Sequence, residues 1–160
     1  KVPAIFVIEN NYYSEHTGIE YAVGTDDLKA RTEGFGFPVF VGDGSDFFSV
    51  YAAAAKAVEH ARAGNGPAGL FLEMGRYHGH FVGDPQGYRG EGELDRLRQD
   101  FCCLKNFRER MAQTGELTSE DLDAIDSEVM TLIEDSVVAA KAAPRPTPDQ
   151  LLQDVYVNYA

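Results

Sequence analysis

Positive charge is scarce in this sequence. Lysine and arginine together number 14, against 26 aspartate and glutamate residues, which leaves a net charge of -12. A field of that sign repels nucleic acid phosphates and anionic lipid, so we expect neither nucleic acid nor a membrane among the partners. No apolar run approaches the roughly 20 residues that a membrane-spanning helix needs. Residues 1–10 also lack the basic, apolar and small-residue regions of a signal peptide.

Cysteine is limited to one adjacent pair, Cys102 and Cys103. Neighbouring cysteines seldom reach disulfide geometry with each other, so nothing in the sequence indicates an oxidising compartment. We therefore expect a cytoplasmic protein in which both thiols pack in a helix. A zinc site formed by these thiols with His78 and His80 is an alternative, but their spacing matches no compact zinc pattern.

Short apolar runs alternate with helical patterns through the first half of the chain. Strands are predicted at 4–8, 38–41 and 68–73, and helices at 26–34 and 47–61, the latter capped by Ser45 or Asp46. This alternation predicts an α/β fold in which a parallel sheet carries helices on both faces. The run at 4–8 is typical of a strand buried on both faces. Because nothing before it supplies a neighbouring unit, we expect residue 1 to fall inside a fold.

The second half of the sequence is charged and helical. Amphipathic helices are predicted at about 91–113 and 119–142, the second opened by a capping box that starts at Thr118. A proline-containing connector and a last short helix at 149–156 follow. We therefore divide the one expected domain into an α/β part, residues 1–89, and a helical C-terminal extension, residues 90–160.

The segment Glu9-Asn10-Asn11-Tyr12-Tyr13 follows the first predicted strand. Open α/β sheets bind their ligands at the carboxyl ends of strands, which is where this segment lies. An amide oxygen beside a free backbone carbonyl can serve as a ligand pair for magnesium. The alternative is that the two asparagines only form a polar turn.

A loop rich in polar side chains leaves the third predicted strand. It begins Arg76-Tyr77-His78-Gly79-His80 and continues through Asp84-Pro85 to Tyr88-Arg89, and we call residues 76–89 the His80 loop. Two histidines, two arginines and an aspartate make poor core material, and catalytic groups collect in loops that follow strands. The alternative is that the imidazoles lie at the surface or only stabilise the loop.

Gly42-Asp43-Gly44 is a third polar segment that could bind a ligand. An aspartate between glycines can approach a diphosphate-bound cation closely. The ordinary role of such a segment between a strand and a helix is to form a turn and a cap, and we favour that role here.

The order of these segments, from Pro3-Ala4 through Asn10-Asn11 and Gly42-Asp43-Gly44 to the His80 loop, resembles the alpha subunits of thiamine-diphosphate-dependent dehydrogenases. The resemblance covers nearly the whole chain. In that family a Gly-Asp-Gly precedes an Asn-Asn, and the two hold magnesium on the diphosphate. Here the Asn-Asn half alone is present, so the resemblance implies that another chain or segment supplies the upstream Gly-Asp-Gly. Gly42-Asp43-Gly44 aligns with a different turn of the family.

The resemblance also implies roles for individual residues. Asn11 binds magnesium through its side chain and Tyr13 through its backbone carbonyl, and both belong to the cofactor site. His80 matches the family histidine that faces the thiazolium of the cofactor, and Arg76 and His78 belong to the same catalytic loop. An imidazole there can protonate or stabilise negative charge that develops during the reaction. Phe81 stands where mitochondrial relatives carry a phosphorylated serine, which excludes phosphorylation at that point.

The segment from His80 to Gln86 looks closer to bacterial acetoin dehydrogenases than to the pyruvate or branched-chain enzymes. The resemblance implies the C-terminal portion of an alpha subunit whose enzyme cleaves acetoin, or decarboxylates a 2-oxoacid such as pyruvate. The acyl unit would pass to a lipoyl group. The implied fold is part of a thiamine-diphosphate-binding parallel-sheet fold, and the implied cofactors are thiamine diphosphate and Mg²⁺.

The same resemblance implies partner chains. They are a beta subunit in an alpha2beta2 assembly and a lipoyl acyltransferase on which that assembly docks, so the chain should be inactive alone. Met74-Gly75 and Phe101-Cys102-Cys103 depart from the family pattern, which leaves the choice among small-molecule substrates open. A non-catalytic alpha-like assembly module, in which Asn11 and His80 are structural, is the alternative function.

Overall fold

The computed structural model describes residues 1–153, and of Leu152 only the backbone. The chain divides into two compact units, Lys1–Glu116 and Leu117–Ala160. The predicted boundary at residue 89, between the α/β part and its helical extension, is a separate division and stays a prediction. The helices and strands of the first unit are β1 (Ile5–Asn10), β2 (Tyr13–Ser14), β3 (Thr17–Gly18), α1 (Ile19–Ala22), α2 (Leu28–Glu33), β4 (Val39–Asp43), α3 (Phe47–Arg62), β5 (Ala68–Glu73), α4 (Glu93–Asp100) and α5 (Cys103–Thr114).

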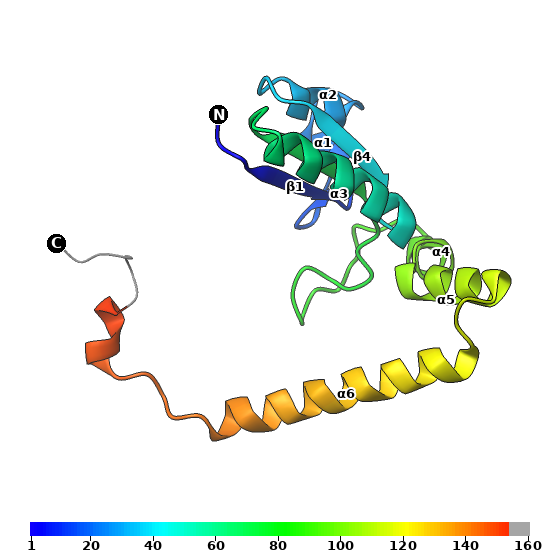
Figure 1. The fold of residues 1–160 in the computed structure, drawn as a ribbon, viewed down its shortest axis with the longest axis vertical. Helices are drawn as coiled ribbons and strands as arrows, with labels where there is room; N and C mark the ends of the chain where they lie inside the picture. The colour runs from blue at the N-terminus through cyan, green and yellow to red at the C-terminus, as the bar shows by residue number, and fades with distance from the viewer. Residues whose placement is uncertain (154–160) are drawn as a thin grey trace. The chain divides into compact units, whose positions relative to one another are not determined.

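Three parallel strands form the main sheet, in the order β1-β5-β4. Figure 1 shows β1 and β4 of this sheet, with α3 lying over it. Glu73, the last residue of β5, lies opposite both Asn10 of β1 and Asp43 of β4. All three strands therefore end at one level, and the polar segments that follow them leave the sheet at the same edge. This is the edge where open α/β sheets bind ligands.

Helices cover both faces of the sheet, as the sequence predicts. Successive residues of a strand point to opposite faces. Leu70 and Leu72 of β5 pack with Ala53 of α3 in the buried core of one face. On the other face, a Cβ placed on Gly69 would lie 3.4 Å from Thr32 of α2. The predicted α/β class, a parallel sheet with helices on both faces and a helical C-terminal segment, is confirmed.

Strand β1 is less buried than its sequence predicts. The side chains of Phe6 and Val7 are 51% and 56% exposed. Within residues 1–153, β1 pairs with β5 on one side and has no strand on the other. The apolar composition of this strand predicts burial on both faces, but its actual burial depends on the strands and helices that pack beside it.

The predicted helix at 91–113 is wrong, because two helices occupy that range. Gly92 adopts a left-handed φ of 69° immediately before α4, and Phe101-Cys102 interrupts the path between α4 and α5. The hydroxyl of Tyr77 donates a hydrogen bond to the carbonyl of Phe101, which a continuous helix would use within itself. A contact between residues distant in sequence thus breaks a pattern that is helical throughout.

The second unit contains α6 (Ser119–Ala142) and a 3₁₀ helix, η1 (Pro148–Leu152). The predicted capping box is present, since the Thr118 hydroxyl accepts from the Asp121 amide at 3.1 Å and Asp121 accepts from the Thr118 amide at 2.9 Å. The predicted last helix at 149–156 overlaps η1, and its positions from 154 onward lie outside the described residues. Within residues 1–153, no helix is long and apolar enough to cross a membrane.

Candidate functional site

Two asparagines form the turn that follows β1. Oδ1 of Asn10 accepts a hydrogen bond from the Tyr12 amide at 3.2 Å, and Oδ1 of Asn11 accepts from the Tyr13 amide at 3.0 Å. Tyr12 itself has a φ of 65°, a left-handed conformation that side-chain-bearing residues rarely adopt. The predicted polar turn therefore exists. The hydrogen bond within the turn leaves Oδ1 of Asn11 able to bind a cation, because an amide oxygen has a second lone pair.

Tyr13 fastens this turn to the start of α4. It begins the β2–β3 hairpin, and its hydroxyl donates to Oε2 of Glu93 at 2.8 Å. Burial, together with that hydrogen bond to a carboxylate, raises the pKa of Tyr13 to about 12. The Tyr13 ring also packs edge-on against Tyr88, with 5.3 Å between centroids. The Tyr13 side chain thus has a structural role, and its predicted role toward a metal rests on the backbone carbonyl alone.

A buried carboxylate organises the loop after β5. The side chain of Asp84 is fully buried, and it accepts hydrogen bonds from the Tyr88 hydroxyl at 2.7 Å and from the His80 and Gln86 amides, both at 2.8 Å. Burial by itself raises the pKa of Asp84, but these three hydrogen bonds outweigh it and lower the pKa to about 2. The charged form is therefore the one that holds the loop closed.

The glycine between the two loop histidines is required by this carboxylate. A Cβ placed on Gly79 would lie 2.6 Å from Cβ of Asp84, closer than non-bonded carbon atoms approach. Glycine permits the backbone to run directly past a buried side chain. The sequence His78-Gly79-His80 thereby fits around Asp84.

Arg76 ties the loop to the β2–β3 hairpin. One of its terminal nitrogens, Nη2, donates to the Tyr88 hydroxyl at 2.8 Å and to the Glu15 carbonyl at 2.7 Å. Its guanidinium carbon also lies 5.6 Å from the centre of the Tyr13 ring, within cation–π range. Nε of Arg76 is buried and has no hydrogen-bond acceptor among the residues that the structure describes. A buried donor without an acceptor is costly to the fold.

Arg89 closes the base of the loop. Its side chain is only 3% exposed, and it donates from Nη1 to Oε1 of Glu93 at 2.8 Å and from Nη2 to the Arg76 carbonyl at 2.6 Å. Burial raises the pKa of Glu93, but hydrogen bonds from Tyr13, the Gly90 amide and Arg89 lower it below its usual value overall. Arg89 and Glu93 thus form a largely buried, hydrogen-bonded ion pair beneath the loop.

The two predicted catalytic imidazoles lie at the surface of this fixed loop. His78 and His80 are both exposed. They line a surface hollow of about 470 Å³ together with Gly79, Phe81, Val82, Asp84 and Gln86. The polar network acts on the backbone of the loop, and the imidazoles remain accessible to a ligand in the hollow. This arrangement suits general acid–base chemistry, which needs a positioned but reachable proton donor.

The structure joins some predicted site residues directly and others through intermediaries. Arg76 lies against Tyr13, and the amide of Tyr13 is bound by Asn11. No hydrogen bond or ring contact joins Asn11 to His80 within residues 1–153. The connection between them runs through Tyr13 and Tyr88, which pack against each other.

His16 and Glu93 are two site residues that the sequence analysis missed. Nε2 of His16 lies 3.7 Å from Oδ2 of Asp84, and its ring stacks on Tyr88 with 5.1 Å between centroids. In sequence, His16 belongs to an unremarkable polar stretch, and Glu93 to a helix with many charges. Their roles depend on contacts with distant residues, and the best available signal was their nearness to the Asn-Asn and Tyr88-Arg89 segments.

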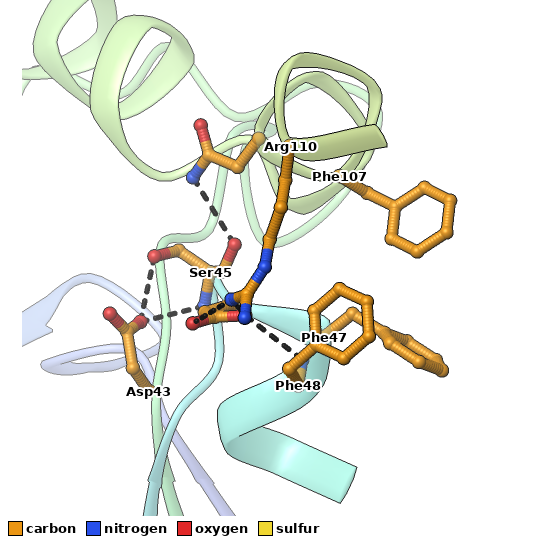
Figure 2. Close-up of a pocket in the computed structure, with 8 residues that line it drawn as sticks. Asp43, Ser45, Phe47, Phe48, Phe107 and Arg110 are labelled. Atoms are coloured by element: carbon orange, nitrogen blue, oxygen red, sulfur yellow. Dashed lines mark hydrogen bonds and ion pairs between the residues drawn. The ribbon is translucent and has the colours of Figure 1, made fainter. Parts of the chain in front are cut away.

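The Gly-Asp-Gly segment after β4 uses its polar groups within the protein (Figure 2). Oδ1 of Asp43 accepts from the amide and the hydroxyl of Ser45 at 2.8 and 2.7 Å. Asp46 caps α3 by accepting from the Phe48 amide at 2.9 Å, and it pairs with Arg110 of α5 at 3.4 Å. The segment is a turn followed by a helix cap, the role that the sequence analysis favoured.

The side chains suggested for a zinc site do not gather in the described part of the chain. No group of three or more histidine, cysteine, aspartate and glutamate side chains there is placed to hold a metal ion. Cys102 precedes the first turn of α5 and is half-buried, whereas Cys103 is exposed. The expectation that both thiols pack in a helix is therefore wrong, because Cys102 lies outside α5 in an extended conformation and Cys103, its first residue, is exposed.

Comparison with known proteins agrees with the fold and with the order of the polar segments. The chain belongs to the family described as the dehydrogenase E1 component, whose model matches residues 1–149. This confirms the resemblance to dehydrogenase alpha subunits on which the sequence analysis relied.

Several curated relatives match over nearly the whole chain. The chain is 49% identical over 158 residues to the alpha subunit of acetoin:2,6-dichlorophenolindophenol oxidoreductase from Cupriavidus necator, covering 99% of this chain and 47% of the relative. It is 35% identical over 158 residues to the Bacillus subtilis protein of the same name, covering 99% and 47%. It is 36% identical over 155 residues to the pyruvate dehydrogenase E1 component subunit alpha of Rhizobium meliloti, covering 97% and 44%. The chain thus spans less than half the length of these relatives.

Proposed function

We propose that this chain is the C-terminal portion of the alpha subunit of a thiamine-diphosphate-dependent dehydrogenase. The observation that carries the proposal is the loop held by buried Asp84, which leaves His80 accessible at the sheet edge where the Asn11 turn also lies. In this proposal residues 1–89 are the C-terminal part of a thiamine-diphosphate-binding domain, and residues 90–160 are its helical extension. Membership of the dehydrogenase E1 family supports it.

Thiamine diphosphate and Mg²⁺ are the cofactors that we propose. The Asn11 side chain and the Tyr13 backbone carbonyl offer oxygen, the ligand atom that magnesium prefers. Two oxygens do not complete an octahedral site. The remaining ligands would be diphosphate oxygens, water and the aspartate of an upstream Gly-Asp-Gly that lies outside this chain. The donor atoms present therefore fit the metal as one part of a shared site.

The residues of the His80 loop would act on the substrate. When bound, thiamine diphosphate supplies the carbanion chemistry needed to cleave a bond beside a carbonyl group. His80 would donate a proton to the substrate oxygen or stabilise negative charge on it, and its exposed imidazole in the hollow can reach such an atom. Arg76 would position the loop through Tyr88 and Glu15. His78 would act beside His80 in the same hollow.

Acetoin is the substrate that we favour, with pyruvate or another 2-oxoacid as the competing choice. The support is the 49% identity to an acetoin oxidoreductase alpha subunit, against 36% to a pyruvate dehydrogenase alpha subunit. We further propose that the acyl unit passes to a lipoyl group on an acyltransferase. The active assembly would be an alpha2beta2 enzyme with a beta subunit, located in the cytoplasm.

A non-catalytic assembly module remains the second candidate function. The observation that favours it is that Oδ1 of Asn11 already accepts a hydrogen bond from the Tyr13 amide, which is a structural role within the turn. In that case the Asp84 network would only stabilise the fold. The chain would then assemble with partners without supporting turnover.

The proposed function can be tested with the assembled enzyme and an artificial electron acceptor dye. Dye reduction would be measured with acetoin and with pyruvate, each with and without added thiamine diphosphate and Mg²⁺. We expect turnover that requires both cofactors and is faster with acetoin. Turnover with pyruvate alone would overturn the substrate proposal. An assembly that forms but shows no cofactor-dependent turnover with either compound would favour the assembly module.

A further inference from the structure

The two cysteines of this chain are adjacent and lie at the start of α5. Cys102 precedes the helix in an extended conformation, with φ of -76° and ψ of 101°, and Cys103 is the first helical residue. Cys102 is half-buried and Cys103 is exposed. A reagent in solution can therefore reach the Cys103 thiol directly. The Cys102 thiol belongs to the preceding residue.

This pair borders the base of the His80 loop. The Tyr77 hydroxyl donates to the carbonyl of Phe101, the residue before Cys102. That hydrogen bond places the phenol next to Cys102, and burial, and then the neighbouring thiols of Cys102 and Cys103, raise the pKa of Tyr77 to about 12. Tyr77 is in turn flanked by Arg76 and His78, both members of the loop.

The packing between these two segments leaves no spare space. A Cβ placed on Gly75 would lie 2.7 Å from Cδ2 of Leu97 and 3.4 Å from Cβ of Phe101. The Gly75 backbone thus packs closely against the side chains of Leu97 and Phe101, the residue before Cys102. A group added at Cys102 would lie next to the hydrogen bond between Tyr77 and the Phe101 carbonyl.

We propose that Cys102 and Cys103 form a two-thiol site that binds trivalent arsenicals, and that occupancy of this site disturbs the His80 loop through Tyr77. An organic arsenoxide binds such a pair by condensation. Two S–H bonds and the arsenic–oxygen bond break, two arsenic–sulfur bonds form, and one water molecule leaves. Arsenic remains trivalent, so the reaction needs no oxidant or reductant.

Chelation suits this pair better than a disulfide does. A disulfide demands a short sulfur–sulfur bond and closely spaced Cβ atoms, which adjacent residues seldom achieve. A bridging arsenic atom spans a wider gap between the two sulfurs. Once the first thiol has reacted, the second bond forms within the same molecule, which strengthens binding by about 10²–10⁴-fold over a single attachment.

Binding of phenylarsine oxide to the assembled enzyme tests this site without depending on catalysis. The wild type would be compared with Cys102→Ser and Cys103→Ser by the amount of arsenic retained per chain after gel filtration. Serine is a favoured residue before the first turn of a helix, so Cys102→Ser should fold normally. We expect the wild type to retain one more arsenic atom per chain than either variant does. A dithiol, but not a monothiol, should release this additional arsenic.

The effect on the loop rests on the proposed function and is read separately. Dye reduction is the suitable assay because it does not involve a lipoyl dithiol, which would itself bind arsenic. We expect phenylarsine oxide to reduce turnover of the wild type by about tenfold or more, as a displaced catalytic loop would, and to spare both serine variants.

Equal arsenic retention in all three proteins would overturn the site, and binding without selective loss of turnover would overturn its connection to the loop. An enzyme inactive before treatment would count against the proposed function and leave the binding result intact.

Discussion

The turn after β4 and the loop after β5 leave the same edge of the same sheet, and both contain an aspartate among glycines. After β4, Asp43 accepts two hydrogen bonds from Ser45, and Asp46 caps α3 and pairs with Arg110. After β5, buried Asp84 binds the backbone of a long loop and leaves His78 and His80 exposed. The hydrogen bonds of the first segment fix the turn itself and the start of α3. Those of the second segment fix the loop backbone and leave the two imidazoles accessible.

The comparison shows that composition at a strand end does not distinguish a structural from a functional segment. What distinguishes them is whether polar side chains remain accessible once the internal hydrogen bonds have formed. The β4 turn offers a hollow of about 240 Å³ lined partly by Phe47, Phe48 and Phe107. The hollow beside the β5 loop, at about 470 Å³, is lined by both imidazoles. We therefore expect substitution of the exposed imidazoles to affect turnover and substitutions in the turn to affect stability.

The largest effect is expected for His80→Ala. Loss of a positioned proton donor should lower kcat of the assembled enzyme by about 10²–10⁴-fold. Because Asp84 holds the His80 backbone and not its side chain, the thermal stability should stay close to that of the wild type. Dye-reduction kinetics and thermal unfolding measure the two quantities. A normal kcat would remove His80 from the mechanism.

The next effect concerns Asp84 and acid. Its pKa of about 2 in the folded protein lies below the ordinary value of 3.8. The charged carboxylate therefore stabilises the fold fully at pH above about 4, and this contribution is lost as the pH falls through about 2. Asp84→Asn should remove it at all pH values and accelerate exchange of the His80 amide hydrogen by about tenfold or more at pH 7. Unchanged exchange of that amide in Asp84→Asn would contradict the role of the carboxylate.

A smaller and purely structural effect is expected in the β4 turn. A Cβ on Gly44 would lie 2.6 Å from the Glu73 carbonyl oxygen and 2.9 Å from Cβ of Met74, whereas one on Gly87 in the β5 loop would meet nothing within 4 Å. Gly44→Ala should therefore lower the free energy of unfolding by about 1–3 kcal/mol. Gly87→Ala, the matched control, should change it by no more than about 0.5 kcal/mol. Denaturant unfolding compares them, and equal stabilities would show that the turn can shift to accommodate the methyl group.

Much of the first unit could be predicted from its sequence, because local patterns determine it. The alternation of buried runs and helical periodicity predicts β1, β4, β5 and α3, and Asp46 caps α3 as one of two predicted candidates. The Tyr77 contact that ends α4 near Phe101 could not be predicted, because it joins residues 24 positions apart.

The candidate site shows the same limit. Asn11, Tyr13, Arg76, His78 and His80 were proposed from their order in the chain and from family resemblance, and their roles in catalysis and metal binding stay predictions. The network that supports them, through His16, Asp84, Tyr88 and Glu93, becomes visible only once the hairpin, the loop and α4 are folded together. Side chains that act through distant partners leave little trace in local sequence.

The most direct test of the account measures magnesium-dependent binding of thiamine diphosphate to the assembled enzyme. Asn11→Ala would be compared with Asp43→Ala, which removes the aspartate of the Gly-Asp-Gly turn. We expect Asn11→Ala to weaken binding by at least about tenfold, since even residues that only support metal ligands contribute that much. Asp43→Ala should bind the cofactor as the wild type does and lose about 1 kcal/mol of stability. Weakened binding in Asp43→Ala together with normal binding in Asn11→Ala would contradict the account, because it would place the cofactor at the turn after β4.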